Sequence, residues 1–195
     1  MKKDLAAKQA AKKKLDDAIS KLIRREIEAA RKKATAAGKK NVTNNNVFTL
    51  TPEAAKLSNS FSGNKGLLPW PVAEGTISSF FGEHPHKELK GIMVKNNGID
   101  IQSGKGSTAR SIFEGTVSGV INIPGAGKAV IIRHGEYLSV YSNLETVNVN
   151  TGDKVSTKQS IGTLADAGEG AKGEIHLEIW KNTSKLDPKS WLARK

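Results

Sequence analysis

The chain of 195 residues contains no cysteine. It therefore forms no disulfide and offers no thiolate ligand to a metal ion, and a domain without disulfides suits the cytosol and the periplasm equally. The sequence also lacks any run of 18 apolar residues, the length that a membrane-spanning helix requires. No apolar segment follows the basic start at Met1 to Lys3, so no signal peptide is predicted. If the protein acts outside the cytoplasm, we expect this sequence to be a mature form or a fragment.

Positive charge is concentrated at the start of the chain. Residues 1–40 hold 14 Lys and Arg against 5 Asp and Glu, within a total net charge of +12. A basic balance of this kind is typical of nucleic-acid binding. However, no aromatic residues stand between these cations to stack on bases, so we expect no nucleic-acid partner.

Proline and glycine are missing from residues 1–37, which favours one long helix that ends before Gly38. Apolar residues recur there at intervals of three and four, namely Leu15, Ala18, Ile19, Leu22, Ile23 and Ile27. Because this spacing gives a single narrow apolar stripe, the segment is interpreted as a basic amphipathic helix and a coiled-coil remnant. A solvated helix, ordered by whatever it touches, is the alternative.

Residues 38–66 are interpreted as a linker that contains one short helix. Its Asn-rich part, 41–46, is expected to be a loop. Thr51, followed by Pro52 and an acidic residue, is a typical helix start, and the helix is predicted over 52–61. Leu57 and Phe61 are four residues apart, so they share one helix face and need an apolar partner.

From residue 67 to 195 glycine becomes frequent, and short β-branched runs alternate with turn signals. The runs are 75–81, 98–102, 109–120, 128–134, 137–142, 160–164 and 174–180. This pattern predicts a mainly β domain, an antiparallel sheet or sandwich, behind the N-terminal helix. A domain of this length buries roughly 65–70% of its unfolded surface, so we expect it to be the stable unit of the chain.

Motifs along the whole β domain resemble those of the LytM (lysostaphin-type) zinc endopeptidases of peptidoglycan. Asn97-Gly98-Ile99-Asp100-Ile101 stands where that family carries its His-x-x-x-Asp motif. Tyr141-Ser142-Asn143-Leu144 stands at Tyr-x-His-Leu, and Glu174-Ile175-His176-Leu177-Glu178-Ile179 stands at His-x-His-Phe-Glu-Ile. The resemblance implies a LytM-type antiparallel β fold.

The resemblance also implies three zinc ligands and two catalytic histidines, and three of these five positions have changed. Asn96 stands at the first ligand position, whereas Asp100 and His176 keep their residue types; the catalytic positions hold Asn143 and Glu174. A catalytic zinc normally has three protein ligands, and an amide oxygen is a poor donor beside imidazole. An Asn side chain also exchanges no proton near neutral pH. We therefore expect no metal, no cofactor and no peptidase activity.

Three further histidines are candidate metal ligands. His84 and His86 form an i, i+2 pair, but a solvated loop is the favoured interpretation of their segment. His134 precedes Gly135 at a predicted turn, and we expect no metal role for it.

A degenerate LytM site behind a coiled coil, together with the tail Pro188-Lys189-Ser190-Trp191-Leu192, resembles murein hydrolase activators of the EnvC type. That resemblance implies a protein of the periplasm or cell envelope that stimulates peptidoglycan (N-acetylmuramoyl-L-alanine) amidases in cell division. It further implies that the coiled coil engages a division-associated membrane complex. Two alternatives stay open: a weakly active zinc endopeptidase of peptidoglycan, and a peptidoglycan-binding module.

The vestigial peptidase groove is the predicted binding site for the amidase, because an emptied groove that once fitted an extended chain can still hold a peptide segment. Its predicted residues are Asn96, Asp100, Asn143, Glu174 and His176, with Met93 and Tyr141 as walls. The short helix with Leu57 and Phe61, or the basic helix before it, is a candidate lid over this groove.

Overall fold

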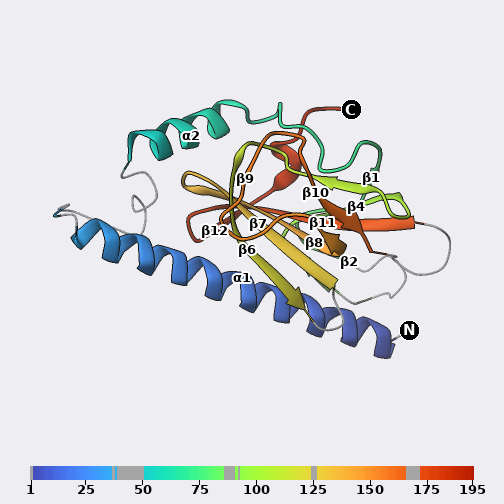
Figure 1. Ribbon diagram of the computed structural model, residues 1–195. Helices are drawn as coiled ribbons and strands as arrows, with labels where there is room; N and C mark the ends of the chain where they lie inside the picture. The colour runs from blue at the N-terminus through green and yellow to red at the C-terminus, as the bar shows by residue number, and fades with distance from the viewer. Residues whose placement is uncertain are drawn as a thin grey trace.

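The computed structural model (Figure 1) describes residues 2–36, 38, 51–85, 91, 93–123, 127–165 and 172–195. The helices are α1 (Lys2–Ala36), α2 (Pro52–Gly63) and the short 3-10 helix η2 (Pro188–Ser190). The strands are β1 (Thr76–Ser79), β2 (Gly82–Pro85), β3 (Met93–Asn96), β4 (Ile99–Gly104), β5 (Thr108–Arg110), β6 (Gly115–Ile123), β7 (Gly127–His134), β8 (Tyr137–Val147), β9 (Lys154–Val155), β10 (Ser160–Leu164), β11 (Lys172–Lys181) and β12 (Ser184–Leu186). Neither of the described α-helices has a stretch apolar enough to cross a bilayer.

One ten-stranded sheet dominates the molecule. Its main path runs β1-β4-β11-β8-β7-β6-β9, with β10 and β12 attached to β8 and β11, and β5 paired to β10. Strands β2 and β3 form a separate two-stranded sheet. The pairings within both sheets are antiparallel, so the predicted mainly β, LytM-type fold with a long N-terminal helix is confirmed.

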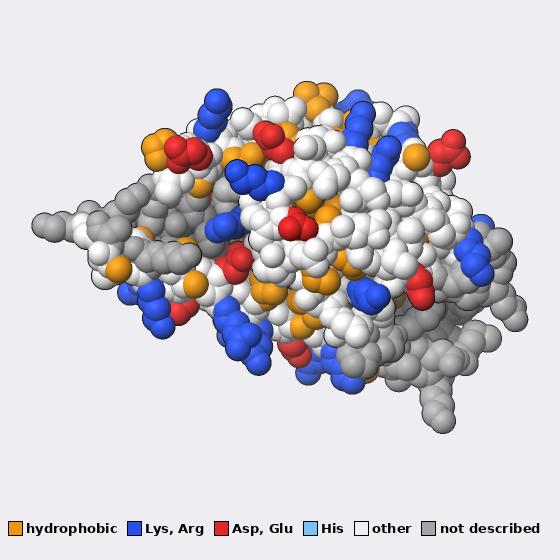
Figure 2. Space-filling model, viewed as in Figure 1, with side chains coloured by type: hydrophobic (Ala, Val, Ile, Leu, Met, Phe, Trp, Pro, Cys, Tyr) orange, Lys and Arg blue, Asp and Glu red, His pale blue; other side chains and the backbone are white. Residues whose placement is uncertain are grey.

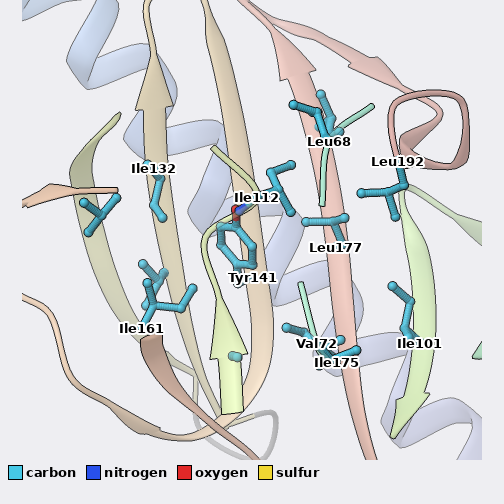
Figure 3. Close-up of a cluster of buried hydrophobic side chains, with 14 of the residues drawn as sticks. Leu68, Val72, Ile101, Ile112, Ile132, Tyr141, Ile161, Ile175, Leu177 and Leu192 are labelled. Carbon is cyan, nitrogen blue, oxygen red and sulfur yellow. The ribbon is translucent and has the colours of Figure 1, made fainter. Parts of the chain in front are cut away.

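The two faces of the sheet have separate apolar clusters because successive side chains of a strand point to opposite faces. In β7, Val130 and Ile132 belong to the main core, whereas Ala129 and Ile131 belong to the second cluster. In β11, Ile175 and Leu177 point into the main core, which Figure 3 shows in close-up. The alternate residues of β11 therefore point to the other face, where the candidate site lies.

Helix α1 covers part of that other face (Figure 1). The four residues of its stripe that are buried there are Leu15, Ile19, Ile23 and Ile27, and they pack on Ala129, Ile131, Leu138, Val140 and Trp180. The chain's own sheet thus covers the stripe that predicted a coiled-coil seam. A coiled coil through this stripe would require α1 to leave the sheet, and it remains a prediction.

Helix α2 packs at the turn between β7 and β8, on the side of the main core. Phe61 is fully buried, and its ring lies 4.8 Å from the rings of both His134 and Tyr137. Gly135 has a φ of 72°, and a Cβ there would lie 2.6 Å from the carbonyl oxygen of Ala54 in α2. The turn residue therefore has to be glycine for the helix to approach so closely.

The position of α2 corrects the prediction that Leu57 and Phe61 form a lid over the groove. Phe61 contacts Tyr137 at the first residue of β8, whereas Asn143 lies six residues further along the same strand. The apolar partner that these residues need is the core itself, because Phe61 lies inside it, and Leu57 is half-buried on the same helix.

Lowering the pH from 7 to about 4 is expected to destabilise the fold through His134. Burial lowers the pKa of His134 to about 4, although its hydrogen bond to the Glu114 carbonyl opposes the shift. The neutral ring donates from Nδ1 to that carbonyl (2.6 Å) and accepts at Nε2 from the Ser139 hydroxyl (2.7 Å). Because the folded pKa lies below the unfolded value of about 6.5, this stability is full above pH 6.5. It falls by about 3 kcal/mol as the pH approaches 4.

The measurement is urea unfolding at pH 7 and at pH 4 for the wild type and for His134→Gln. Carboxylates titrate in both proteins, so the difference between the two losses reports on His134. The wild type should lose more stability than the variant, and equal losses would contradict the assignment.

Candidate functional site

Strand β11 presents Glu174, His176 and Glu178 on the sheet face that is opposite to the main core. In the sheet register His176 lies between Asp100 of β4 and Ser142 of β8. His176, Asp100 and Glu178 are all buried, with 4%, 5% and 2% of their surfaces exposed. Three ionisable side chains are therefore held together away from solvent, which requires that their charges compensate one another.

An imidazole bridge between two carboxylates provides this compensation. His176 Nδ1 lies 2.6 Å from Asp100 Oδ1, and Nε2 lies 3.1 Å from Glu178 Oε1. Trp180 Nε1 donates to the other oxygen of Glu178 at 2.6 Å, and this second hydrogen bond fixes the orientation of the carboxylate. Burial alone would lower the pKa of His176, but the hydrogen bonds and charges of Asp100 and Glu178 outweigh it and raise the pKa to about 9.

The residues at this site do not fit a zinc ion. Each ring nitrogen of His176 already faces a carboxylate oxygen, so a zinc ion would have to displace one of these two hydrogen bonds. Asn96 stands at the remaining ligand position, and its amide Nδ2, a donor, faces Asp100 Oδ2 at 3.2 Å. The opposite amide orientation would bring two acceptor oxygens together, so the NH2 group must point toward Asp100. Within the described part of the chain, no group of three or more His, Cys, Asp and Glu has the arrangement of a metal site.

Asn96 also links the bridge to His84. Its amide Nδ2 donates to the Ser79 hydroxyl at 3.1 Å, and that hydroxyl lies 3.2 Å from His84 Nε2. His84 belongs to strand β2 and not to the loop that the sequence predicts, because β2 pairs with β3 across His84 and Val94. His86, the other candidate of the pair, lies outside the described residues.

Of the two positions predicted to be former catalytic positions, Glu174 contacts this network, and neither Glu174 nor Asn143 is among the residues that line the pocket described below. Glu174 Oε2 accepts a hydrogen bond of 3.0 Å from Ser78, whose hydroxyl also lies 3.1 Å from the Asp100 carbonyl oxygen. Asn143 follows Ser142 in β8 and has a φ of 65°, a left-handed conformation that asparagine tolerates better than most residues. Neither position holds the imidazole that the peptidases use.

Of the two predicted groove walls, Met93 lines the site and Tyr141 does not. Met93 is 58% exposed, whereas Tyr141 is fully buried on the core face of β8. The Tyr141 hydroxyl accepts a hydrogen bond of 2.9 Å from the backbone of Ile112, and Figure 3 shows the ring among the core side chains. Tyr141 is thus corrected from a groove wall to a core residue.

A pocket of about 350 Å³ opens at the site between α1, β3 and β11. It is lined by Lys13, Leu15 and Asp16 of α1, by residues 93–97, and by His176 and Glu178. Asp16 forms an ion pair with Lys185 of β12, which helps to hold this part of α1 in place. Helix α1 is therefore one wall of the pocket.

Sequence reasoning missed Ser79 and Glu178, which complete the hydrogen-bond network. Glu178 stands two residues after His176, so strand alternation places both on one face, and this signal was available in the sequence. No sequence pattern indicates Ser79, because it reaches Asn96 through the pairing of β2 with β3.

Comparison with known proteins relates the sequence of this chain to a protein family. The sequence profile of peptidase family M23 matches residues 94–188. The murein hydrolase activator NlpD of Escherichia coli is 29% identical over 128 residues, which is 65% of this chain and 31% of that protein. An uncharacterized protein of Neisseria meningitidis is 31% identical over 141 residues, which is 69% of this chain and 22% of the relative. The chain thus spans less than a third of the length of each of these two relatives.

Solved structures share the fold. Csd3 of Helicobacter pylori superposes with a TM-score of 0.56 at 27% identity, over 67% of this chain and 36% of that one. A zinc containing peptidase from Vibrio cholerae has a TM-score of 0.56 at 24% identity, over 67% and 41% of the two chains. The predicted LytM-type recognition is therefore confirmed.

Proposed function

Because the β domain of this chain is a peptidase family M23 domain, we propose that it is a non-catalytic activator of peptidoglycan amidases in the cell envelope. The observation that carries this proposal is Asn96 at one of the three ligand positions, hydrogen-bonded to Asp100, which leaves only Asp100 and His176, themselves paired, where a catalytic zinc needs three ligands. The NlpD relatives are named murein hydrolase activators, and this name supports an activating role for the chain. The cellular setting is daughter-cell separation, in which the activated amidase splits the peptidoglycan that joins the two cells.

The amidase binds at the pocket beside His176. Two buried polar atoms, Asn96 Oδ1 and Ser142 Oγ, have no hydrogen-bond partner within the described part of the chain, and buried polar atoms of folded proteins are rarely left in this state. An N–H group of the amidase can satisfy Asn96, while Met93 offers an apolar contact at the rim. The groove thus combines a polar floor with an apolar edge, as peptide-binding grooves do.

Activation follows if this groove prefers the open form of the amidase. A partner that binds one of two conformations more tightly shifts the population toward it. Moving a two-state enzyme from 1:99 to 99:1 needs about 5.5 kcal/mol of differential binding, which a few buried anchors can provide. No chemistry by the activator is required.

Helix α1, the second of the two candidate lids that the sequence predicts, is the gate of this pocket. Its residues Lys13, Leu15 and Asp16 form a wall of the pocket, so the docked helix narrows the approach to Asn96 and His176. When α1 leaves the sheet, its apolar stripe becomes free for the coiled coil that would engage a division-associated membrane complex.

Changing Met93 to aspartate is expected to lower amidase stimulation by about tenfold, because a charge replaces an exposed apolar contact at the pocket rim. The measurement is release of label from peptidoglycan by a purified amidase with added chain. Leu67→Asp is the matched control, since Leu67 is also exposed, at 69% against 58% for Met93, and is not among the pocket-lining residues. Full stimulation by a folded Met93→Asp protein would exclude the pocket as the binding site.

A further inference from the structure

The outer face of α1 carries a strong positive charge. Seven exposed cations lie on it, namely Lys13, Lys14, Lys21, Arg24, Arg25, Arg31 and Lys32. Two exposed acids, Asp17 and Glu28, are the only carboxylates among the exposed described side chains between residues 13 and 32. Figure 2 shows Lys and Arg side chains along the edge of the molecule where α1 runs. The face therefore keeps a net charge of about five after its acids are counted.

The helix geometry sets this face opposite to the buried stripe. At about 100° per residue, the seven cations fall within an arc of about 120°, and the stripe that packs on the sheet is centred on the other side. The cations therefore stay exposed while α1 is docked, and they extend over roughly 29 Å of helix from Lys13 to Lys32.

We propose that this basic face of α1 binds the anionic headgroup surface of a phospholipid bilayer. A straight row of cations on a convex edge fits an extended planar surface, and each Lys or Arg near an anionic bilayer contributes about 1 kcal/mol. Phosphate groups of headgroups fit the guanidinium of Arg24 and Arg25. Nucleic acid fits less well, because no aromatic side chain on this face offers a stacking surface for bases.

Binding of this kind is purely electrostatic. The apolar side chains of the α1 stripe, such as Ile19 and Ile23, are buried against the sheet, so the stripe is not free to enter the bilayer. The helix lies parallel to the membrane and the β domain lies on its far side. Binding is expected to weaken steeply as salt rises from about 0.1 M to about 1 M, because the Debye length falls from about 10 Å to about 3 Å.

The experiment is co-sedimentation of the full chain with phosphatidylcholine vesicles, with and without phosphatidylglycerol, at low and high salt. We expect binding only with phosphatidylglycerol and only at low salt. The triple variant Lys21→Glu, Arg24→Glu, Arg25→Glu should bind at least ~100-fold more weakly, because three contacts are lost and three repulsions are added. The matched control is Lys56→Glu, Lys154→Glu, Lys172→Glu, which has the same net charge, changes only exposed residues outside α1, and should retain binding.

Three outcomes would overturn the proposal. They are equal binding to vesicles without phosphatidylglycerol, equal losses in the two triple variants, and binding to duplex DNA with no binding to vesicles. If the α1 variant fails to fold, the lipid and salt dependence of the wild type decides alone. The assay contains no amidase, so its failure would leave the activator function untouched.

Discussion

Replacing His176 with alanine is expected to lower the free energy of unfolding by about 3–5 kcal/mol. The substitution leaves Asp100 and Glu178 as two buried carboxylates, 5% and 2% exposed, with no cation between them. Breaking a buried ionic bridge by removing one partner costs far more than losing a surface pair, because the remaining charge cannot return to water. The bridge is thus the structural element that occupies the place of a metal centre.

Urea unfolding in the presence of EDTA and in the presence of zinc measures this effect. The loss should be the same in both solutions, since Asn96 is a poor third ligand and we expect no metal at this site. His84→Ala is the matched control: His84 is half-buried beside the same network and has one hydrogen bond to Ser79, so its loss should stay within about 1 kcal/mol. A His176→Ala loss that appears only with zinc would show that a metal holds the site.

Changing Ile19 and Ile23 together to aspartate is expected to release α1 from the sheet and to raise amidase stimulation severalfold. Both side chains are fully or almost fully buried, at 0% and 1% exposure, against apolar residues such as Ile131 and Leu138. An isolated carboxylate is strongly unfavourable there, because the side chains that Ile19 and Ile23 pack against in this cluster are apolar. Once α1 leaves, the pocket loses the wall formed by Lys13 and its neighbours.

Hydrogen exchange of the α1 amides and the amidase assay together measure this result. The α1 amides should lose protection while the amides of the β domain keep theirs. Ala10→Asp with Ala29→Asp is the matched control, because both alanines are exposed on α1 and the added charge is the same. Unchanged protection of α1 would refute the release, and released α1 without a gain in stimulation would refute the gate.

The sequence predicts the β domain and much of the site because strand alternation is a local property. Glu174 and His176 share a face of β11 as their spacing of two requires, and Asp100 lies opposite His176 in the neighbouring strand. Tyr141 and Asn143 have the same spacing, but the left-handed backbone at Asn143 interrupts the regular strand. Tyr141 follows the regular alternation from Tyr137 and shares its core face, so the spacing of two does not bring Tyr141 to the groove.

The partners of the two helices could not be predicted because their periodicity reports an apolar face and not what covers it. The stripe of α1 fits a second helix as well as a sheet, and only the alternate residues of β7 and β8 decide for the sheet. Phe61 likewise requires an apolar contact, and the ring of Tyr137 lies close to it only after the chain has folded.

The most direct test of the non-catalytic activator is digestion of labelled peptidoglycan by the full chain with zinc, first alone and then with a purified amidase. Alone, the chain should release no fragments even at saturating zinc, because Asn96 replaces one of the three ligands that a catalytic zinc requires and Asn143 exchanges no proton near neutral pH. With the amidase, it should accelerate release of the stem peptides. Zinc-dependent cleavage of peptide cross-links by the chain alone, with an unchanged amidase rate, would contradict the assignment.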